Sequence, residues 1–151
     1  MLKYTNKSIF DLKVDAVVNP VNTVGVMGAG LAKQFKDIYA PTHIHFEEYY
    51  IAACQQKHFE TSRCLVYPTH NDPTRFVIFL ATKNHYRNPS RIEYIQKGLE
   101  DLSDTINEYK IKSIALPKLG CGLGGLRWEL VEEEIKSFSK KHEKIEIIVC
   151  L

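Results

Sequence analysis

The sequence predicts an open α/β sheet with parallel strand pairs and helices on both faces. Apolar runs of strand length alternate along the chain with segments in which apolar residues recur every three or four positions. That alternation is typical of a sheet covered by helices on both sides. Two glycine-rich loops, residues 19–30 and 117–126, each follow an apolar run and lead into a helical segment.

The first elements are expected to form one edge and the centre of the sheet. The apolar run at residues 16–19 predicts a buried strand, and residues 2–4 predict an edge strand before it. A helix is expected to begin within residues 30–35. A second helix is expected over residues 41–56, with inward positions at Ile44, Tyr49 and either Ala52 or Ala53.

The middle of the chain predicts two strands and one long helix. The strands cover residues 63–67 and 76–81, and the residues between them favour a turn, namely His70, Asn71, Asp72 and Pro73. Ser90 and Glu93 have the spacing of a capping box, which predicts a helix start. Behind them, an amphipathic helix is indicated by Ile92, Ile95, Leu99, Leu102 and Ile106.

The last part of the chain predicts a strand, a helix and a final strand. The strands cover residues 113–116 and 145–150. The helix between them is marked by apolar residues at helical spacing, namely Trp128, Val131, Ile135 and Phe138. Residues 1–151 are expected to form one domain. Because the chain stops at the end of a strand, this domain could be a piece of a longer protein.

Composition limits the class of protein. The chain has 151 residues and a formal charge of +2, so one domain is expected and a nucleic-acid partner is neither required nor excluded. There is no apolar run of about eighteen residues, which argues against a membrane span, and no signal-peptide pattern. Four scattered cysteines predict free thiols in a reducing cytoplasm. The histidines lack a ligand-like arrangement, so no metal or other cofactor is expected.

The two glycine-rich loops predict a clamp around a diphosphate. Glycine permits close approach of a ligand to the backbone, and the helix start after each loop offers free N–H groups to phosphate oxygens. In an open sheet, ligands bind beyond the carboxyl ends of the strands, where both loops and residues 82–85 are expected. The first loop has the spacing GxxGxG and lacks the dinucleotide pattern GxGxxG, and neither loop has the Gly-Lys-Ser/Thr of a P-loop. A nucleotide-like ligand is expected without a nicotinamide or NTPase function.

The motifs at these loops resemble those of macrodomains, which bind ADP-ribose. The signature comprises residues 14–19, Asn22 and residues 25–30. Residues 22–28, 34–36, 81–83 and 119–126 with Trp128 are similar to the DNA ADP-ribosyl glycohydrolase antitoxins of the DarT–DarG type. A more distant similarity is to the terminal ADP-ribose protein glycohydrolases. The resemblance implies a three-layer α/β/α macrodomain over residues 1–151, with a mixed central sheet flanked by helices.

The resemblance also implies residue roles. Lys83 matches the lysine on which hydrolysis depends, and Asn22 matches a residue that hydrogen-bonds the distal ribose. In the protein-directed relatives that lysine attacks the anomeric carbon with help from an acid in the second loop, where this chain has Gly124. Ligand contacts are expected from both loops and their neighbours, namely Ser8, Ile9, Gly25, Val26, Met27, Gly28, Gly30, Thr82, Pro117, Leu119, Gly120, Cys121, Gly122, Leu123 and Gly124.

The sequence does not decide between two possible roles for Lys83, or between two for Ser8. A nucleophilic Lys83 must be neutral, which needs a lowered pKa. A charged Lys83 would instead stabilise negative charge that develops on the leaving base or on ribose hydroxyls. Ser8 stands where many macrodomains carry an acid that accepts a hydrogen bond from adenine. Its hydroxyl could accept the same bond, with help from the Ile9 backbone, or Ser8 could be a surface turn residue.

The expected function is hydrolysis of thymidine-linked ADP-ribose from DNA by a cytoplasmic, monomeric, antitoxin-like enzyme. The expected partners are ADP-ribosylated single-stranded DNA and a cognate ADP-ribosyltransferase toxin. Arg87, Arg91 and Tyr86 could contact phosphates and a base, or could belong to a solvated loop and helix start. Three alternatives are hydrolysis of protein-linked ADP-ribose esters, dephosphorylation of ADP-ribose 1″-phosphate, and binding of ADP-ribose without catalysis.

Overall fold

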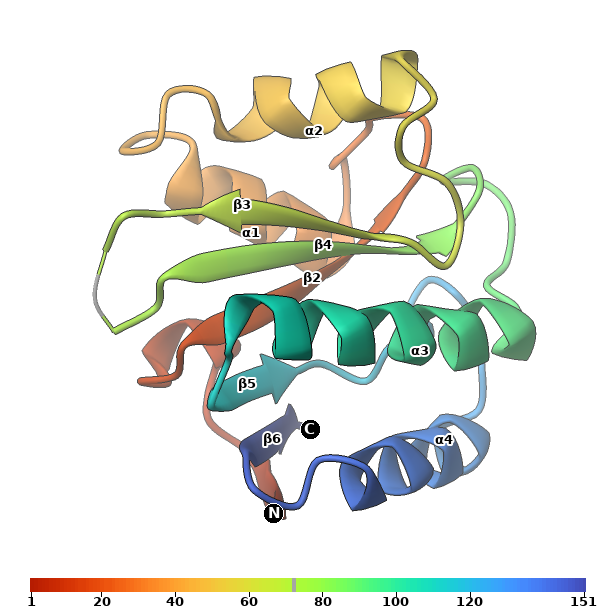
Figure 1. Ribbon diagram of the computed structural model, residues 1–151. Helices are drawn as coiled ribbons and strands as arrows, with labels where there is room; N and C mark the ends of the chain where they lie inside the picture. The colour runs from red at the N-terminus through yellow and green to blue at the C-terminus, as the bar shows by residue number, and fades with distance from the viewer. Residues whose placement is uncertain (72) are drawn as a thin grey trace.

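The computed structural model, which describes residues 1–71 and 73–151, has a six-stranded mixed sheet at its centre (Figure 1). The strand order is β1-β6-β5-β2-β4-β3. Strand β3 pairs antiparallel with β4, and the other neighbours pair in parallel. The strands are β1 (Leu2–Thr5), β2 (Ala16–Asn22), β3 (Cys64–Pro68), β4 (Phe76–Lys83), β5 (Ser113–Leu116) and β6 (Glu146–Cys150).

Helices cover both faces of this sheet (Figure 1). Helices α1 (Gly30–Tyr39) and α2 (Phe46–Gln55) lie on one face, and α3 (Ile92–Tyr109) and α4 (Trp128–Lys140) lie on the other. A short 3₁₀ helix, η1 (Ile9–Asp11), follows β1. The predicted α/β/α arrangement is therefore confirmed.

The two central strands supply both hydrophobic cores because successive side chains of a strand point to opposite faces. On β2, Val18 packs under α3 and α4, whereas Val17 packs under α1 and α2. On β4, Ile78 packs under α3 and α4, whereas Phe79 packs under α1 and α2. Burial on both faces explains why these strands appear in the sequence as continuous apolar runs.

Both central strands are longer than predicted, and this matters for the site. Strand β2 continues past Asn19 to Asn22, and β4 continues past Ala81 to Lys83. A register shift after Val21 places Asn22 opposite Lys83 in the β2–β4 ladder. The two predicted catalytic residues are thus neighbours on adjacent strands.

The start of the second helix was predicted wrongly. Helix α2 begins at Phe46, because residues 41–45 form turns in which the Thr42 and His43 N–H groups donate to the Tyr39 carbonyl. Ile44 and Tyr49 are exposed, and Phe46 and Tyr50 take the inward positions. Of the two alanines, Ala52 is exposed and Ala53 packs against the core.

The capping box at Ser90 was also predicted wrongly. The N-cap of α3 is Arg91, and no side chain caps that helix end. Ser90 instead donates its backbone N–H to the Gly124 carbonyl at 2.9 Å, so it holds the second glycine loop. The predicted turn between β3 and β4 includes Asp72, which lies outside the described residues.

The sequence also led to expectations about membrane-spanning helices, cysteine thiols and metal sites. Within residues 1–71 and 73–151, no helix is long and apolar enough to cross a membrane, and no cluster of three or more potential metal ligands occurs. Cys54, Cys64, Cys121 and Cys150 are free and partly buried.

Candidate ligand-binding and active site

A cavity of about 900 Å³ lies at the carboxyl ends of β2, β4 and β5. Three segments line it: the first glycine loop with the start of α1, the connection from β4 to α3, and the second glycine loop. Its lining comprises Pro20, Val21, Asn22, Val26, Gly28, Ala29, Gly30, Leu31, Ala32, Thr82, Lys83, Tyr86, Ser90, Pro117, Lys118, Gly120, Cys121, Gly122, Leu123 and Gly124.

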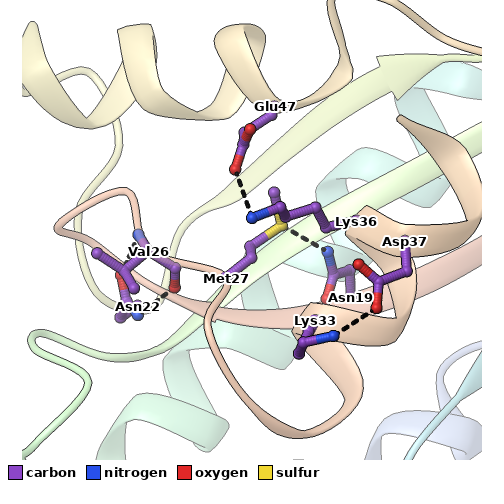
Figure 2. A network of polar contacts seen from close by, with 8 residues as sticks. All are labelled: Asn19, Asn22, Val26, Met27, Lys33, Lys36, Asp37 and Glu47. Carbon is purple, nitrogen blue, oxygen red and sulfur yellow. Dashed lines mark hydrogen bonds and ion pairs between the residues drawn. The ribbon is translucent and has the colours of Figure 1, made fainter. Parts of the chain in front are cut away.

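Asn22 shapes the first loop through both ends of its amide. Its Oδ1 accepts from the N–H groups of Val24 (3.1 Å) and Val26 (3.3 Å), and its Nδ2 donates to the Val26 carbonyl (2.8 Å). Figure 2 shows Asn22 beside Val26. Because several donors converge on Oδ1, the orientation of the amide is fixed. The second Nδ2 hydrogen has no acceptor among the described residues, so Asn22 can offer a donor to a ligand.

Tyr50 of α2 donates hydrogen bonds to Asn22, and the sequence analysis did not identify this residue. Its hydroxyl lies 2.8 Å from Asn22 Oδ1 and 2.7 Å from the Asn22 carbonyl oxygen, so one hydroxyl proton is shared between two acceptors. The ring is fully buried and stacks on Phe79 with centroids 5.2 Å apart. The only signal in the sequence is the spacing of four between Phe46 and Tyr50.

Met27 anchors the first loop to the core. It is buried, and Asn19 Nδ2 lies 3.7 Å from its sulfur (Figure 2). Gly25 has a φ of +86° and packs beside Ile51, which explains glycine at that position. Neither Met27 nor Gly25 lines the cavity.

The start of α1 presents backbone donors to the cavity. No side chain caps this helix, and Ala29, Gly30, Leu31 and Ala32 all line the cavity. Free N–H groups at a helix start suit phosphate oxygens. Two lysines of α1 are engaged elsewhere (Figure 2): Lys33 pairs with Asp37 at 2.7 Å, and Lys36 pairs with Glu47 at 3.4 Å.

The second loop is closed by its own backbone hydrogen bonds. The Leu126 N–H donates to the Gly120 carbonyl at 2.9 Å, and the Gly125 N–H donates to the Gly122 carbonyl at 3.1 Å. Gly120 has a φ of +73°, and a Cβ there would lie 2.8 Å from Leu126. A Cβ on Gly122 would meet no atom within 4 Å, so this residue faces open space.

Gly124 has no room for a side chain. A Cβ at this position would overlap the Ser90 hydroxyl and lie 2.5 Å from the Gly120 carbonyl oxygen. Ser90 is buried, and its Oγ has no hydrogen-bond partner among the described residues. The packing of the loop therefore excludes an acid at position 124.

Lys83 lies at the mouth of the cavity. Its Nζ donates to the carbonyls of Leu123 (3.2 Å) and Tyr86 (3.4 Å), which ties the second loop to the β4–α3 connection. Partial burial lowers the pKa of Lys83 from its ordinary value. A lowered pKa increases the fraction of neutral amine, whereas the two carbonyl contacts suit an ammonium donor.

Twelve of the predicted site residues line this cavity, and five do not. The five are Ser8, Ile9, Gly25, Met27 and Leu119. The Ser8 hydroxyl accepts from the Phe10 N–H at 3.2 Å and caps η1, and Ile9 and Leu119 are buried in the cores. Contact of these residues with a ligand stays a prediction. Eight lining residues were not among the expected ADP-ribose contacts, although Tyr86 was considered as a contact for a DNA base: Pro20, Val21, Ala29, Leu31, Ala32, Tyr86, Ser90 and Lys118.

The fold and the cavity define a small α/β/α ligand-binding domain whose site lies at the carboxyl ends of the central strands. The family model of the Macro domain matches residues 18–135. The chain belongs to the macrodomain family, which confirms the resemblance found in the loops.

Relatives and solved structures place the chain within one part of this family. It is 39% identical to a DNA ADP-ribosyl glycohydrolase of Thermus aquaticus over 99% of this chain and 41% of that relative. The macrodomain of Mycobacterium tuberculosis DarG superposes with a TM-score of 0.94 at 36% identity, covering 99% of this chain and 97% of that structure. Thermosipho africanus DarTG in complex with ADP-ribose gives a TM-score of 0.89 at 30% identity, covering 99% of this chain and 41% of that structure. The chain spans about two fifths of the length of the curated relatives it matches.

Proposed function

We propose that this domain binds ADP-ribose and removes it from ADP-ribosylated DNA at thymidine, as an antitoxin-like hydrolase. The observation that carries the proposal is the placement of Lys83 and Asn22 side by side at the mouth of a cavity closed by two glycine loops. The similarity to proteins named DNA ADP-ribosyl glycohydrolase supports the same substrate.

The diphosphate of ADP-ribose would lie between the two loops. The uncapped start of α1 supplies N–H groups on one side, and Gly122 leaves space on the other. This placement brings the distal ribose toward Asn22 and Lys83, where the Nδ2 hydrogen of Asn22 would donate to a ribose oxygen.

The reaction breaks the glycosidic bond between the anomeric carbon of the distal ribose and the base. Water adds a hydroxyl group to that carbon, its remaining proton goes to the base, and free ADP-ribose is released. The Lys83 ammonium would stabilise the negative charge that develops on the leaving base. In its neutral form, the same amine would instead attack the anomeric carbon and displace the base, which takes up the amine's proton. Water would then hydrolyse the bond between Nζ and the ribose, which releases ADP-ribose and regenerates the amine.

The second loop favours a base over a protein ester as the leaving group. An ester-directed mechanism that relies on an acid at position 124 has no room for one there, because Ser90 and Gly120 occupy the space that its side chain would need. A DNA strand would also meet Arg87 and Arg91, which are exposed and make no ion pair with any described residue. These side chains would contact phosphates beside the modified base.

We also propose the wider setting of the domain. Residues 1–151 would form a single macrodomain within a longer, cytoplasmic protein, act as a monomer, and oppose an ADP-ribosyltransferase toxin that modifies DNA.

The test compares three substrates at equal enzyme concentration: ADP-ribosylated single-stranded DNA, a protein with glutamate-linked ADP-ribose, and ADP-ribose 1″-phosphate. Release of ADP-ribose is expected to be fastest from DNA. Faster turnover of the protein ester or of the phosphate would refute the proposed substrate. Binding of ADP-ribose with no turnover of any of the three would refute the enzymatic function.

A further inference from the structure

Three large apolar side chains that line the cavity are exposed to solvent, and a fourth is exposed next to them in the first loop. Clustered exposed apolar side chains often mark a binding surface. They are Val24, Val26, Tyr86 and Leu123, with exposed fractions of 44%, 40%, 45% and 71%. We refer to them as the apolar rim. They come from three separate segments of the chain: the first loop, the β4–α3 connection and the second loop.

Each residue of the apolar rim is hydrogen-bonded through its backbone to one of the two predicted catalytic residues. The N–H groups of Val24 and Val26 donate to Asn22 Oδ1. The carbonyls of Tyr86 and Leu123 accept from Lys83 Nζ. The rim therefore lies next to the two residues that are proposed to act on the glycosidic bond.

Leu123 extends this surface across the cavity. Its Cδ1 lies 3.4 Å from the position that a Cβ on Gly30 would occupy, so a side chain of the second loop reaches the start of α1. A group attached to an anomeric carbon beside Lys83 would lie close to Leu123 and Tyr86, because their carbonyls contact Lys83 Nζ.

Tyr86 belongs to a set of planar groups. Its ring centroid lies 4.2 Å from that of His85 with an interplanar angle of 31°, and the Arg87 guanidinium lies 5.6 Å from the ring centre. The Arg87 N–H donates to His85 Nδ1 at 3.1 Å. Thr23 also donates its hydroxyl to the Asn84 carbonyl at 2.8 Å, which fixes this segment against the first loop.

We propose that the apolar rim is a base-binding subsite that stacks the modified base and its neighbour in the strand. The inference rests on the proposed function and specifies the residues that recognise the leaving group. An exposed tyrosine ring and exposed aliphatic side chains match the planar, weakly polar surfaces of bases. Arg87 beside the ring and Lys118 in the cavity wall add positive charge for the strand's phosphates.

The first measurement is the steady-state kinetics of ADP-ribose release from an ADP-ribosylated single-stranded oligonucleotide. Tyr86→Ala is expected to raise KM about tenfold, the scale of one lost stacking contact, and to leave the Kd of free ADP-ribose within about twofold. Tyr86→Phe is expected to restore KM because it keeps the ring. Tyr109→Ala is the matched control, since Tyr109 is a similarly exposed tyrosine that packs against Phe76 at the opposite end of the sheet.

The second measurement separates the subsite from the proposed function. Binding of unmodified single-stranded DNA to the ADP-ribose-saturated domain is followed by fluorescence anisotropy. Weaker DNA binding by Tyr86→Ala but not by Tyr109→Ala supports the subsite. This holds even if the wild-type protein hydrolyses no DNA substrate, because lack of hydrolysis refutes only the proposed enzymatic function. Unchanged KM and DNA affinity in Tyr86→Ala, or an equal loss of ADP-ribose affinity, would overturn the subsite.

Discussion

The Tyr50 hydroxyl offers a sharp test of how the first loop is held. Tyr50→Phe removes the donor to Asn22 and leaves the buried ring and its stacking on Phe79 in place. A typical intramolecular hydrogen bond contributes about 1 kcal/mol net to stability. We expect a Tm lower by about 2–4 °C for a domain of this size.

The effect on turnover should exceed that of a general loss of stability. Without the hydroxyl, Asn22 keeps its partners in Val24 and Val26, but its amide is no longer fixed to the body of the protein. A loss of about 1.4 kcal/mol of transition-state stabilisation corresponds to a tenfold lower kcat. We expect kcat for the ADP-ribosylated oligonucleotide to fall about tenfold, with the Kd of ADP-ribose changed less than threefold.

Tyr49 provides a matched control on the same helix. Its hydroxyl donates to the Val66 carbonyl on β3, away from the cavity. Tyr49→Phe should lower Tm by a similar amount and leave kcat unchanged. The reasoning is refuted if the two variants lose activity equally, or if Tyr50→Phe retains wild-type kcat despite a lower Tm.

Two further predictions concern the second loop. Gly122→Glu should fold normally, because a Cβ at this position meets no atom within 4 Å, but the new carboxylate would repel the diphosphate of ADP-ribose. Calorimetry should show an affinity for ADP-ribose that is lowered at least about a hundredfold. Unchanged affinity in the folded variant would contradict the proposal that the two glycine loops clamp the diphosphate. Gly124→Asp should be destabilised by about 1–3 kcal/mol through overpacking against Ser90 and Gly120, as measured by urea denaturation. It should not acquire faster ester hydrolysis, and a stable variant with improved ester turnover would show that position 124 does accept an acid.

The regular elements of this fold were predictable because burial imposes a clear pattern. The long helix α3 was predicted from apolar residues spaced by three and four, and Ile95, Leu99, Leu102 and Ile106 are buried as expected. The start of α2 was not predictable in the same way. Ile44 fits the apolar spacing expected of a helix. However, residues 41–45 form turns with hydrogen bonds to the Tyr39 carbonyl, so the helix begins only at Phe46.

The parts of the site that contain loop glycines and Lys83 could be predicted from the sequence. The residues that support the site only through packing and hydrogen bonds could not. Lys83 and most loop glycines do line the cavity. Tyr50 and Ser90 escaped because their roles depend on contacts between residues far apart in sequence: 28 positions separate Tyr50 from Asn22, and Ser90 packs against Gly124. Met27 and Leu119 have motif positions, but their side chains point into the cores.

The most direct test of the account is the release of ADP-ribose from an ADP-ribosylated thymidine oligonucleotide by wild-type protein and by Lys83→Ala and Lys83→Gln. The glutamine variant retains a side-chain donor for the Leu123 and Tyr86 carbonyls but lacks the amine. Both variants should lose most turnover and keep ADP-ribose affinity within a few-fold, since the amine acts on the reaction and not on the diphosphate. Full activity in either folded variant would contradict a role for Lys83 in hydrolysis.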